Sequence, residues 1–383
     1  MDWQVKNNKV LIFHNIASSY YKNCLFNALY EQYKNILVVQ LAESREIRSW
    51  KMDFSDLHYP YKVLFKTNLE SIGVVPMSIS VLKVLNKENP DIIYVGGYSY
   101  SAYWVAVIWG KVFRKVIISE INSNEVDRKR KYLKELVKKS FVRMSDVVVT
   151  YGAKSKEYLK LLGVNENKIV IKPNVTGDDY FNKDKRRLPS ALDHKNNILY
   201  VGRLSKEKNI DTLIKAFHMA CRDISSNKFA LVIVGDGPEE EYLKELVKNL
   251  KLENVKFIGF VGKEDISSYY VNSKVFVLPS TSEPWGLVVN EAMMCGLPVV
   301  VSSHCGCSLD LVDGNGYIFD PKDVSKLRFI LKSYMKNNNI SDQGARSLLK
   351  ISRYTPYTAA LKLTNIFKNK FLTAKTNILD VKI

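Results

Sequence analysis

Short apolar runs alternate with amphipathic stretches along the first half of the chain. Continuous apolar runs of this length are typical of parallel strands that are buried on both faces, and amphipathic stretches of helical period are typical of helices between them. The alternation therefore predicts a parallel sheet covered by helices on both faces. The expected strands are Lys9–His14, Ile36–Gln40, Lys62–Phe65, Ile92–Val95, Val116–Ile121 and Val147–Val149.

The second half repeats this alternation after a polar interruption. Residues 184–195 lack apolar periodicity, so we place a linker there. The chain of 383 residues is about two domain lengths. We therefore expect a first domain over 1–185, a second over 196–350, and a helix with a tail over 351–383. The second domain is expected to contain strands at Asn197–Val201, from Leu231 and at Val275–Leu278, and helices at Ile210–Arg222, Glu239–Leu250 and from near Gly286.

Two glutamates flank the start of that last helix. Glu283 lies just before it and Glu291 about two turns along it. Free backbone N–H groups at a helix start bind phosphate, and carboxylates on either side accept hydrogen bonds from sugar hydroxyls. A nucleotide-sugar, with a diphosphate between two sugars, fits this arrangement. The alternative is a capping carboxylate and a solvated helix face, which is the commoner reason for a bare pair.

A second set of candidates follows the strand at Asn197–Val201. Gly202, Arg203 and Lys208 leave its carboxyl end beside a helix start, where open α/β sheets bind ligands. A guanidinium and an ammonium can stabilise the charge that develops on a leaving diphosphate. Solubilising surface charge is the alternative for these two residues.

Taken together, these segments resemble a known family. The order YVGRLSKEKN, VIVGDGPEEEYL, VKFIGF and LPSTSEPWGLVVNEAMMCGLPVV, over about 197–320, is similar to the retaining GT-B glycosyltransferases of family 4, in their GT1-type carboxyl-terminal domain. The resemblance implies an α/β fold of two Rossmann-like domains that face each other across a cleft. It also implies that the carboxyl-terminal helix, here Tyr357 to Phe371, crosses back to the first domain.

The resemblance further implies a donor site in the second domain. Arg203 and Lys208 would contact the diphosphate, Glu291 the ribose and Glu283 the transferred sugar. The remaining donor-binding positions would be Gly202, Gly235, Phe260, Val261, Pro284, Trp285, Gly286 and Leu287. Of these, Gly286 and Leu287 would supply N–H groups to the distal phosphate, and the base would lie near Gly235 and the loop of Phe260 and Val261.

The implied reaction is transfer of a hexosyl group from a UDP- or GDP-sugar to a hydroxyl of a glycan or lipid-linked glycan, with retention. It would serve cell-surface polysaccharide or glycolipid synthesis, and the leaving diphosphate would help to deprotonate the acceptor. No cofactor and no metal are expected. Cys305 and Cys307 lack partner ligands at zinc spacing.

The first domain departs from the family pattern in two loops. Many relatives have a glycine-rich loop where this chain has Ala17, Ser18 and Ser19, and a histidine where it has Glu120. Glu120 is a candidate base or sugar ligand on the acceptor side, and burial in a dry crevice would raise its pKa into a useful range. It could equally pair with Arg128 or Arg130. For His14 we favour a structural role.

Charge separates the two halves. The chain carries a net charge of +18, of which +12 lies in residues 1–187. A basic amphipathic helix over 125–144, with Lys131, Lys134 and Lys138 along one stripe, could lie on an anionic bilayer, or its lysines could simply face water. Because no apolar run could span a bilayer and five scattered cysteines suit free thiols, we expect a cytoplasmic protein, peripheral at the inner face of the membrane.

Two alternative functions are compatible with this fold. A GT-B nucleotide-sugar epimerase would turn over donor without acceptor. A non-catalytic nucleic-acid-binding GT-B module would use the positive charge. The sequence argues against nucleic acid as a partner, because the basic helix lacks interleaved stacking aromatics.

Overall fold

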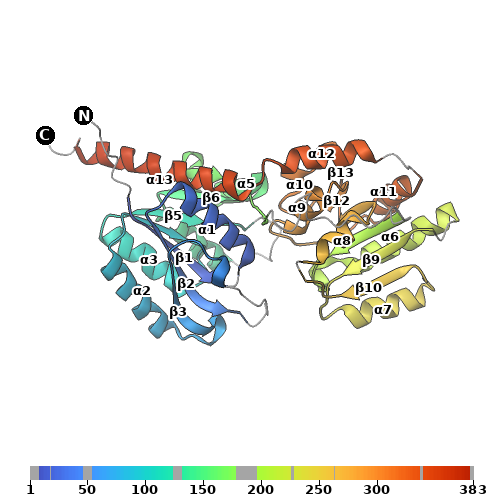
Figure 1. Ribbon diagram of the computed structural model, residues 1–383, viewed down its shortest axis with the longest axis horizontal. Coiled ribbons are helices and arrows are strands. Elements are labelled where there is room, and N and C mark those ends of the chain that lie inside the picture. Colours follow the sequence, from blue (N-terminus) through green and yellow to red (C-terminus); the bar gives the residue numbers. More distant parts are fainter. Residues whose placement is uncertain are drawn as a thin grey trace.

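The structure, a computed structural model, consists of two α/β lobes (Figure 1). It describes residues 8–17, 19–45, 54–123, 132–177, 196–225, 228–262, 264–336 and 340–379, and only the backbone of 132–134 and 370–379. Each lobe is built on one parallel sheet, so the predicted α/β fold with two Rossmann-like units is confirmed. The boundary expected between 185 and 196 lies outside the described residues.

The first sheet has the strand order β3-β2-β1-β4-β5-β6-β7, and its described strands pair in parallel. The six predicted strands are present. A seventh, β7, was missed because its three residues are too few for a recognisable pattern. The strands are β1 (Val10–Ile16), β2 (Ile36–Ser44), β3 (Tyr61–Asn68), β4 (Ile92–Val95), β5 (Val116–Glu120), β6 (Val147–Thr150) and β7 (Ile169–Ile171).

Helices cover both faces of this sheet, as the buried apolar strands require. One face packs against α2, α3, α4 and α5, and the other against α1 and α13. These helices are α1 (Tyr20–Gln32), α2 (Val74–Glu88), α3 (Ser101–Val112), α4 (Tyr132–Arg143), α5 (Gly152–Leu161) and α13 (Pro356–Leu379). Short 3-10 turns lie at Phe54–Asp56, Leu69–Ser71 and Glu166–Lys168.

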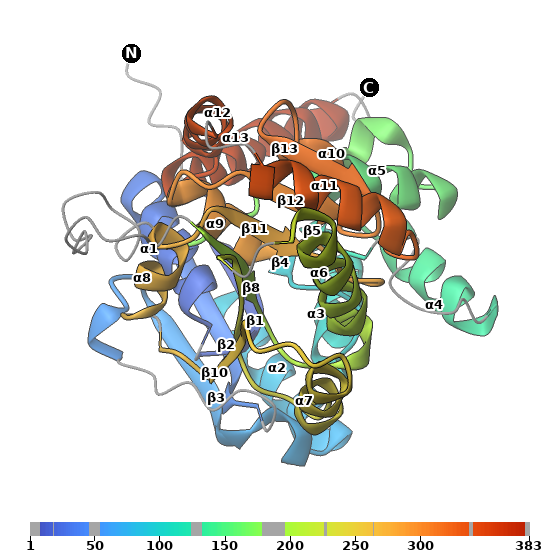
Figure 2. The same cartoon turned by 90° about the vertical axis from the view of Figure 1, so that its right-hand side faces the viewer.

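The second sheet has the order β10-β9-β8-β11-β12-β13 and carries its own core. Its strands are β8 (Asn197–Val201), β9 (Ala230–Val234), β10 (Val255–Gly259), β11 (Val275–Leu278), β12 (Val299–Ser302) and β13 (Gly316–Phe319). Its helices are α6 (Ile210–Ile224), α7 (Glu240–Asn249), α8 (Ile266–Val271), α9 (Leu287–Met294), α10 (Ser308–Leu311), α11 (Val324–Lys336) and α12 (Ser341–Ile351), with a 3-10 turn at Lys206–Lys208. Figure 2 looks from the side of this domain, with α12 and α13 at the top.

The last helix, α13, returns to the first domain, as the resemblance implied. It packs beside α1, and Leu363 and Phe367 are buried in the core that α1 shares with the sheet. The Phe367 ring lies 5.6 Å from that of Tyr33 and 6.4 Å from that of Tyr94, centroid to centroid. The chain's last helix is therefore part of the first domain's core.

A second contact between the domains is polar. The backbone N–H of Ala153, at the start of α5, donates to the Asp310 carboxylate at 3.0 Å. The Lys154 ammonium donates to the Ser308 hydroxyl at 2.7 Å and to the Cys305 carbonyl at 3.0 Å. The Asp310 carboxylate lies at the positive end of the α5 dipole, and the Lys154 ammonium contacts oxygen atoms of the second domain. Both interactions are favourable, so this contact orients one domain on the other.

None of the helices that the structure describes is both long enough and apolar enough to cross a bilayer. All five cysteines are free thiols, as predicted.

Removing the Phe367 ring tests the packing of α13. We expect Phe367→Ala to lower the free energy of unfolding of the first domain by about 3–5 kcal/mol, because the ring is fully buried. Leu361→Ala is the matched control: it lies on the same helix but is 43% exposed, and should change stability by less than about 0.5 kcal/mol. Urea denaturation followed by fluorescence measures both. Equal effects of the two variants would contradict this packing.

Candidate functional site

A glycine sets the backbone conformation at the start of α9. Gly286 has φ 101°, in the left-handed region, and a Cβ there would come within 2.9 Å of the Leu278 side chain. A residue with a side chain would be strained in that conformation. The N–H groups of the first turn of α9, from Leu287 onward, therefore begin directly at the carboxyl end of β11.

The two glutamates lie on either side of this helix start. Glu283 precedes it, and Glu291 lies about one turn into the helix rather than two, because α9 begins at Leu287. The Glu283 carboxylate forms an ion pair with the Lys208 ammonium, and both side chains are mostly buried. The structure thus brings together two residues that are 75 positions apart and were both predicted to bind the donor.

The loops after β8, β9 and β10 meet beside this pair. The Gly202 N–H donates to the Val234 carbonyl at 3.0 Å, and the Gly235 N–H donates to the Gly259 carbonyl at 2.8 Å. Gly235 has φ 127°, and a Cβ there would lie 2.0 Å from the Gly202 carbonyl oxygen. Only glycine permits this approach. The backbone next to Arg203 is therefore fixed in position, and the Arg203 side chain is exposed.

The expected base-binding positions lie next in this row of strand ends. Phe260 follows β10 and is 66% exposed, and Val261 is half-buried beside it. Because Gly259 bonds to Gly235, the two predicted positions of the base pocket are close to each other.

Glu291 is already engaged by two tyrosines. One carboxylate oxygen accepts a hydrogen bond from the Tyr270 hydroxyl and the other from the Tyr21 hydroxyl, each at 2.7 Å. Burial raises the pKa of Glu291, and these two hydrogen bonds oppose that shift. Tyr21 belongs to α1 of the first domain. Sequence analysis missed it, since no local signal links positions 270 residues apart.

Trp285 lies in the contact between the domains. Its indole N–H donates to the Asn290 side chain at 2.9 Å, and its ring centroid lies 6.2 Å from that of Tyr151. A Cβ on Gly152 would come within 2.6 Å of the indole. The side chain is 4% exposed and packs between the first domain and the start of α9. Pro284, beside it, is exposed.

A buried charge cluster lies at the carboxyl end of the first sheet. The Glu120 carboxylate, 3% exposed, forms an ion pair with Lys22, and the Lys172 ammonium lies 3.5 Å from its second oxygen. The Tyr151 hydroxyl donates to it at 2.6 Å, and the Tyr94 hydroxyl also donates. The candidate partners Arg128 and Arg130 lie outside the described residues.

This environment changes the expectation for Glu120. Burial disfavours the ionised carboxylate, but Lys172 and Lys22 outweigh burial and hold the pKa of Glu120 well below its ordinary value. The prediction of a raised pKa is therefore wrong, because a base of useful strength needs the opposite shift. Burial lowers the pKa of Lys172 to about 7, although Glu120 opposes that shift. Of Glu120 and its two lysines, only Lys22, with its side chain 21% exposed, reaches the surface.

His14 has the structural environment that we favoured. Its Nδ1 lies 3.0 Å from the Ile16 carbonyl oxygen and 3.2 Å from the Gln40 side-chain oxygen. Burial, and secondarily the charge of Lys22, lowers the pKa of His14 to about 4. The imidazole is therefore neutral at physiological pH.

The basic stripe expected over 125–144 is only partly described. Lys131 lies outside the described residues, and only the backbone of Lys134 is described. The Lys138 ammonium donates to Glu135 at 2.8 Å and to the Tyr158 hydroxyl at 2.7 Å, so it is bound within the protein. The apolar side of α4 packs on the sheet through Phe141 and Val142.

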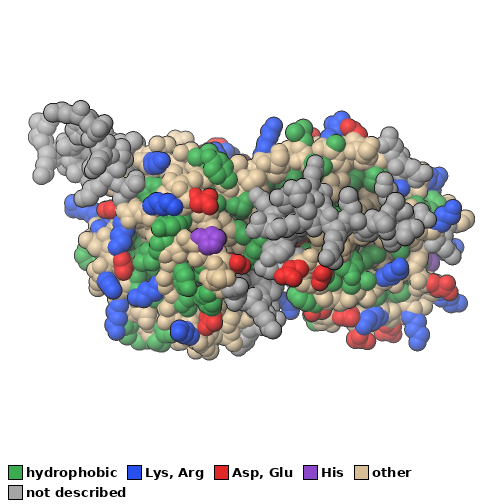
Figure 3. Space-filling model, viewed as in Figure 1, with side chains coloured by type: hydrophobic (Ala, Val, Ile, Leu, Met, Phe, Trp, Pro, Cys, Tyr) green, Lys and Arg blue, Asp and Glu red, His purple; other side chains and the backbone are tan. Residues whose placement is uncertain are grey.

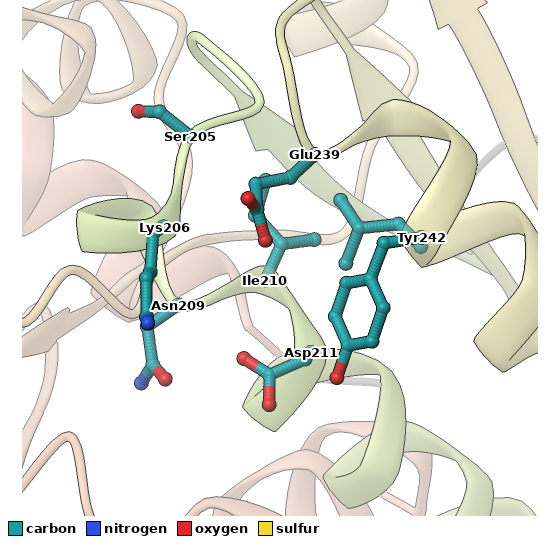
Figure 4. A pocket seen from close by; sticks show the side chains of 8 residues that line it. Ser205, Lys206, Asn209, Ile210, Asp211, Glu239 and Tyr242 are labelled. Atoms are coloured by element: carbon teal, nitrogen blue, oxygen red, sulfur yellow. The ribbon is translucent and has the colours of Figure 1, made fainter.

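A surface hollow of about 280 Å³ lies at the start of α6, on the outer side of the Arg203–Lys208 loop. Figure 4 shows Asp211, Glu239 and Tyr242 around it. None of the predicted donor residues lines it, so it is separate from the candidate site. Within the described parts of the chain, no group of three or more His, Cys, Asp or Glu side chains is placed to hold a metal ion.

The buried His14 predicts a pH dependence of stability. The unfolded chain binds a proton at His14 near the ordinary pKa of 6.5, whereas the folded protein binds it only near pH 4. Stability therefore falls as the pH drops from 6.5 toward 4, by about 2–3 kcal/mol from this residue. His14→Gln cannot bind the proton, so its urea midpoint should fall less over that range. Parallel pH profiles of the two proteins would show that His14 does not carry the effect.

Comparisons with known proteins identify similar sequences and similar folds. Residues 182–347 match the model of the family described as glycosyl transferases group 1. The chain is 23% identical to an uncharacterized 41.2 kDa protein of the cps region of Klebsiella pneumoniae, over 78% of this chain and 86% of that protein. It is 25% identical to the O-antigen chain mannosyltransferase B of Escherichia coli, over 63% of this chain and 65% of that protein.

Similarity to solved structures extends over both domains. HepE of Anabaena, crystallised in complex with UDP, superimposes with a TM-score of 0.76 at 20% identity, over 94% of this chain and 99% of that one. Other curated relatives are matched over a smaller share of their length, 60% and 48% in two cases. The chain therefore has the GT-B fold, and its second domain is similar to the group 1 glycosyl transferases.

Proposed function

We propose that the protein transfers a hexosyl group from a UDP- or GDP-sugar to a hydroxyl of a glycan or lipid-linked glycan, with retention of anomeric configuration, in cell-surface polysaccharide or glycolipid synthesis. One observation carries the proposal. Glu283 pairs with Lys208 just before the left-handed Gly286 at the start of α9, and Glu291 lies about one turn into that helix, inside the segment that matches the group 1 family. The names of the relatives, a mannosyltransferase and a UDP-bound protein among them, support it.

The donor would replace contacts that the protein now makes with itself. Lys208 is paired with Glu283, and Glu291 with Tyr21 and Tyr270. A bound diphosphate would form ion pairs with Lys208 and Arg203. The hydroxyls of the transferred sugar and of the ribose would donate hydrogen bonds to the two carboxylates. Because Lys208, Glu283 and Glu291 already have partners, binding exchanges their hydrogen bonds instead of creating all of them.

In the proposed reaction the bond between the anomeric carbon and the diphosphate oxygen breaks, and the acceptor oxygen bonds to the same face of that carbon. The acceptor proton passes to the leaving diphosphate oxygen. Arg203 and Lys208 stabilise the charge on that diphosphate. Glu120 takes no part as a base, because two lysines lower its pKa and so weaken it as a proton acceptor, and because it is buried.

We propose that no metal is required. A guanidinium and an ammonium provide the positive charge that a divalent cation supplies in metal-dependent transferases. We also propose that the protein acts at the inner face of an anionic membrane, where a lipid-linked acceptor would be found.

Removing either cation tests the donor assignment. We expect Arg203→Ala and Lys208→Ala to lower turnover with a UDP- or GDP-sugar about 100-fold or more, because each would stabilise the developing diphosphate charge. Lys206→Ala, an exposed lysine in the same loop, is the matched control and should keep its rate. Product formation from radiolabelled donor and a glycan acceptor measures all three.

Two further arms complete this assay. Activity should be unchanged in excess EDTA, and a lost activity that Mg²⁺ restores would refute metal independence. Donor turnover without acceptor would favour an epimerase. Full transfer by the Arg203→Ala variant would contradict the role of the cations.

Tyr21 provides a separate test through binding alone. In Tyr21→Phe the Glu291 oxygen loses its partner in the free protein, so a ribose hydroxyl displaces nothing there. We expect UDP or GDP to bind about 3–10-fold more tightly, from a hydrogen bond of about 0.5–1.5 kcal/mol. A thermal-shift titration with nucleotide diphosphates measures this and identifies the base.

Tyr30→Phe, more than two turns further along α1, is the matched control and should bind as the unaltered protein does. Weaker binding by Tyr21→Phe would mean that its hydroxyl contacts the nucleotide directly.

A further inference from the structure

Two neighbouring helices of the first domain expose apolar side chains on their outer side. Val75 is 68% exposed, Ile108 51% and Val112 70%. We call this surface the outer helical face. It comprises Val74, Val75, Ile79 and Leu82 of α2, and Ile108, Val112 and Phe113 of α3 and its end.

This exposure is unusual because both helices also bury an apolar side. In α2 the inward positions are Met77, Val81, Val84 and Leu85. In α3 they are Ala102, Tyr103, Ala106, Val107 and Trp109. A surface helix usually pairs one apolar side with a polar one, and a helix that is apolar all round is usually covered. A group of exposed apolar residues on adjoining helices marks a binding surface.

Exposed cations lie at one end of the outer helical face. Lys83 and Lys87 lie in the second half of α2, and Arg114 lies just after α3. The acidic side chains nearby are engaged: Glu88 pairs with Lys9 at 2.7 Å, and Asp146 with Lys111 at 2.9 Å. Figure 3 shows Lys and Arg side chains along the left and lower edge of this domain. The face is therefore apolar along both helices and cationic at the end where α2 and α3 finish, next to the amino-terminal ends of the strands.

That combination favours an anionic lipid bilayer over a second copy of the chain. In a twofold dimer the same patch would meet itself and bring its cations together. A bilayer accepts apolar side chains below the level of its headgroups, while lysines and arginines contact anionic lipid.

The outer helical face also extends toward the candidate site. α2 begins after β3, so Val74 and Val75 lie at the edge of the sheet where the strands end. Glu120, the last residue of β5, and Tyr151, which follows β6, lie at that same edge. A bilayer contact here would place the strand ends beside the membrane surface.

We infer that the outer helical face docks this protein on anionic membrane. The inference deepens the proposed function by naming the surface that would bring the site to a lipid-linked acceptor. The docking itself requires neither donor nor acceptor.

Co-sedimentation of the full chain with vesicles tests this, in the absence of nucleotide and acceptor. Binding is expected to vesicles of phosphatidylglycerol and phosphatidylcholine, and about tenfold or more weaker to phosphatidylcholine alone. A variant with Val75→Ser, Ile79→Ser and Val112→Ser should bind the phosphatidylglycerol-containing vesicles about tenfold or more weakly. A variant with Lys83→Glu and Lys87→Glu should be weakened to a similar extent.

Leu161→Ser with Phe329→Ser is the matched control, since these residues are 63% and 67% exposed but lie on α5 and α11. It should bind vesicles as the unaltered protein does. The thermal shift with UDP or GDP should be the same in every variant, which shows that each is folded and separates this test from the donor site.

Unchanged vesicle binding by the triple serine variant would overturn the inference. A dimer of the unaltered protein in sedimentation velocity, lost in that variant while vesicle binding is absent throughout, would assign the face to a second copy instead. Vesicle binding without any nucleotide response would count against the proposed function and leave the docking surface standing.

Discussion

The arrangement of the two domains depends on the packing of Trp285 against the first domain. This residue lies between β11 and α9, and its indole fits against Tyr151 and the surface left open by Gly152. The nearby contact of α5 with Asp310 adds charge-assisted hydrogen bonds to that apolar contact. Every one of these groups follows a strand of one sheet or the other. The carboxyl ends of the two sheets therefore meet, and the candidate residues of both domains are brought to one region.

Within that region most charged groups have a partner in the protein itself. The second domain pairs Lys208 with Glu283, and the first surrounds Glu120 with Lys22, Lys172 and two tyrosines. The two sets differ in burial. Glu283 and Lys208 retain some exposure, so a ligand can compete for them, whereas Glu120 and Lys172 are almost fully enclosed. Burial of an ion pair makes its loss costly, and we therefore regard the Glu120 cluster as support for the site.

The first domain also separates two kinds of surface. One face of its sheet is covered by α1 and α13, which pack together, and α13 supplies apolar side chains to the core on that face. On the other face α2 and α3 pack inward and leave a second apolar side exposed. The difference follows from the chain's path, since the last helix returns to one face of the sheet only.

The sequence by itself determined most of the strands, several helices and the candidate donor segment. Strand runs such as Ile92–Val95 and Val275–Leu278 depend on local apolar pattern, and Glu283 to Glu291 form one contiguous segment around a helix start. Only the tertiary structure decided which groups face each other. Tyr21 and Glu291 are 270 residues apart, and the lysines that hold Glu120 come from α1 and from the end of β7. It also decided that Trp285 is buried between the domains. Local pattern reports on a residue's own helix or strand, but the pKa of a carboxylate and the partner of a hydroxyl depend on neighbours that only long-range packing supplies.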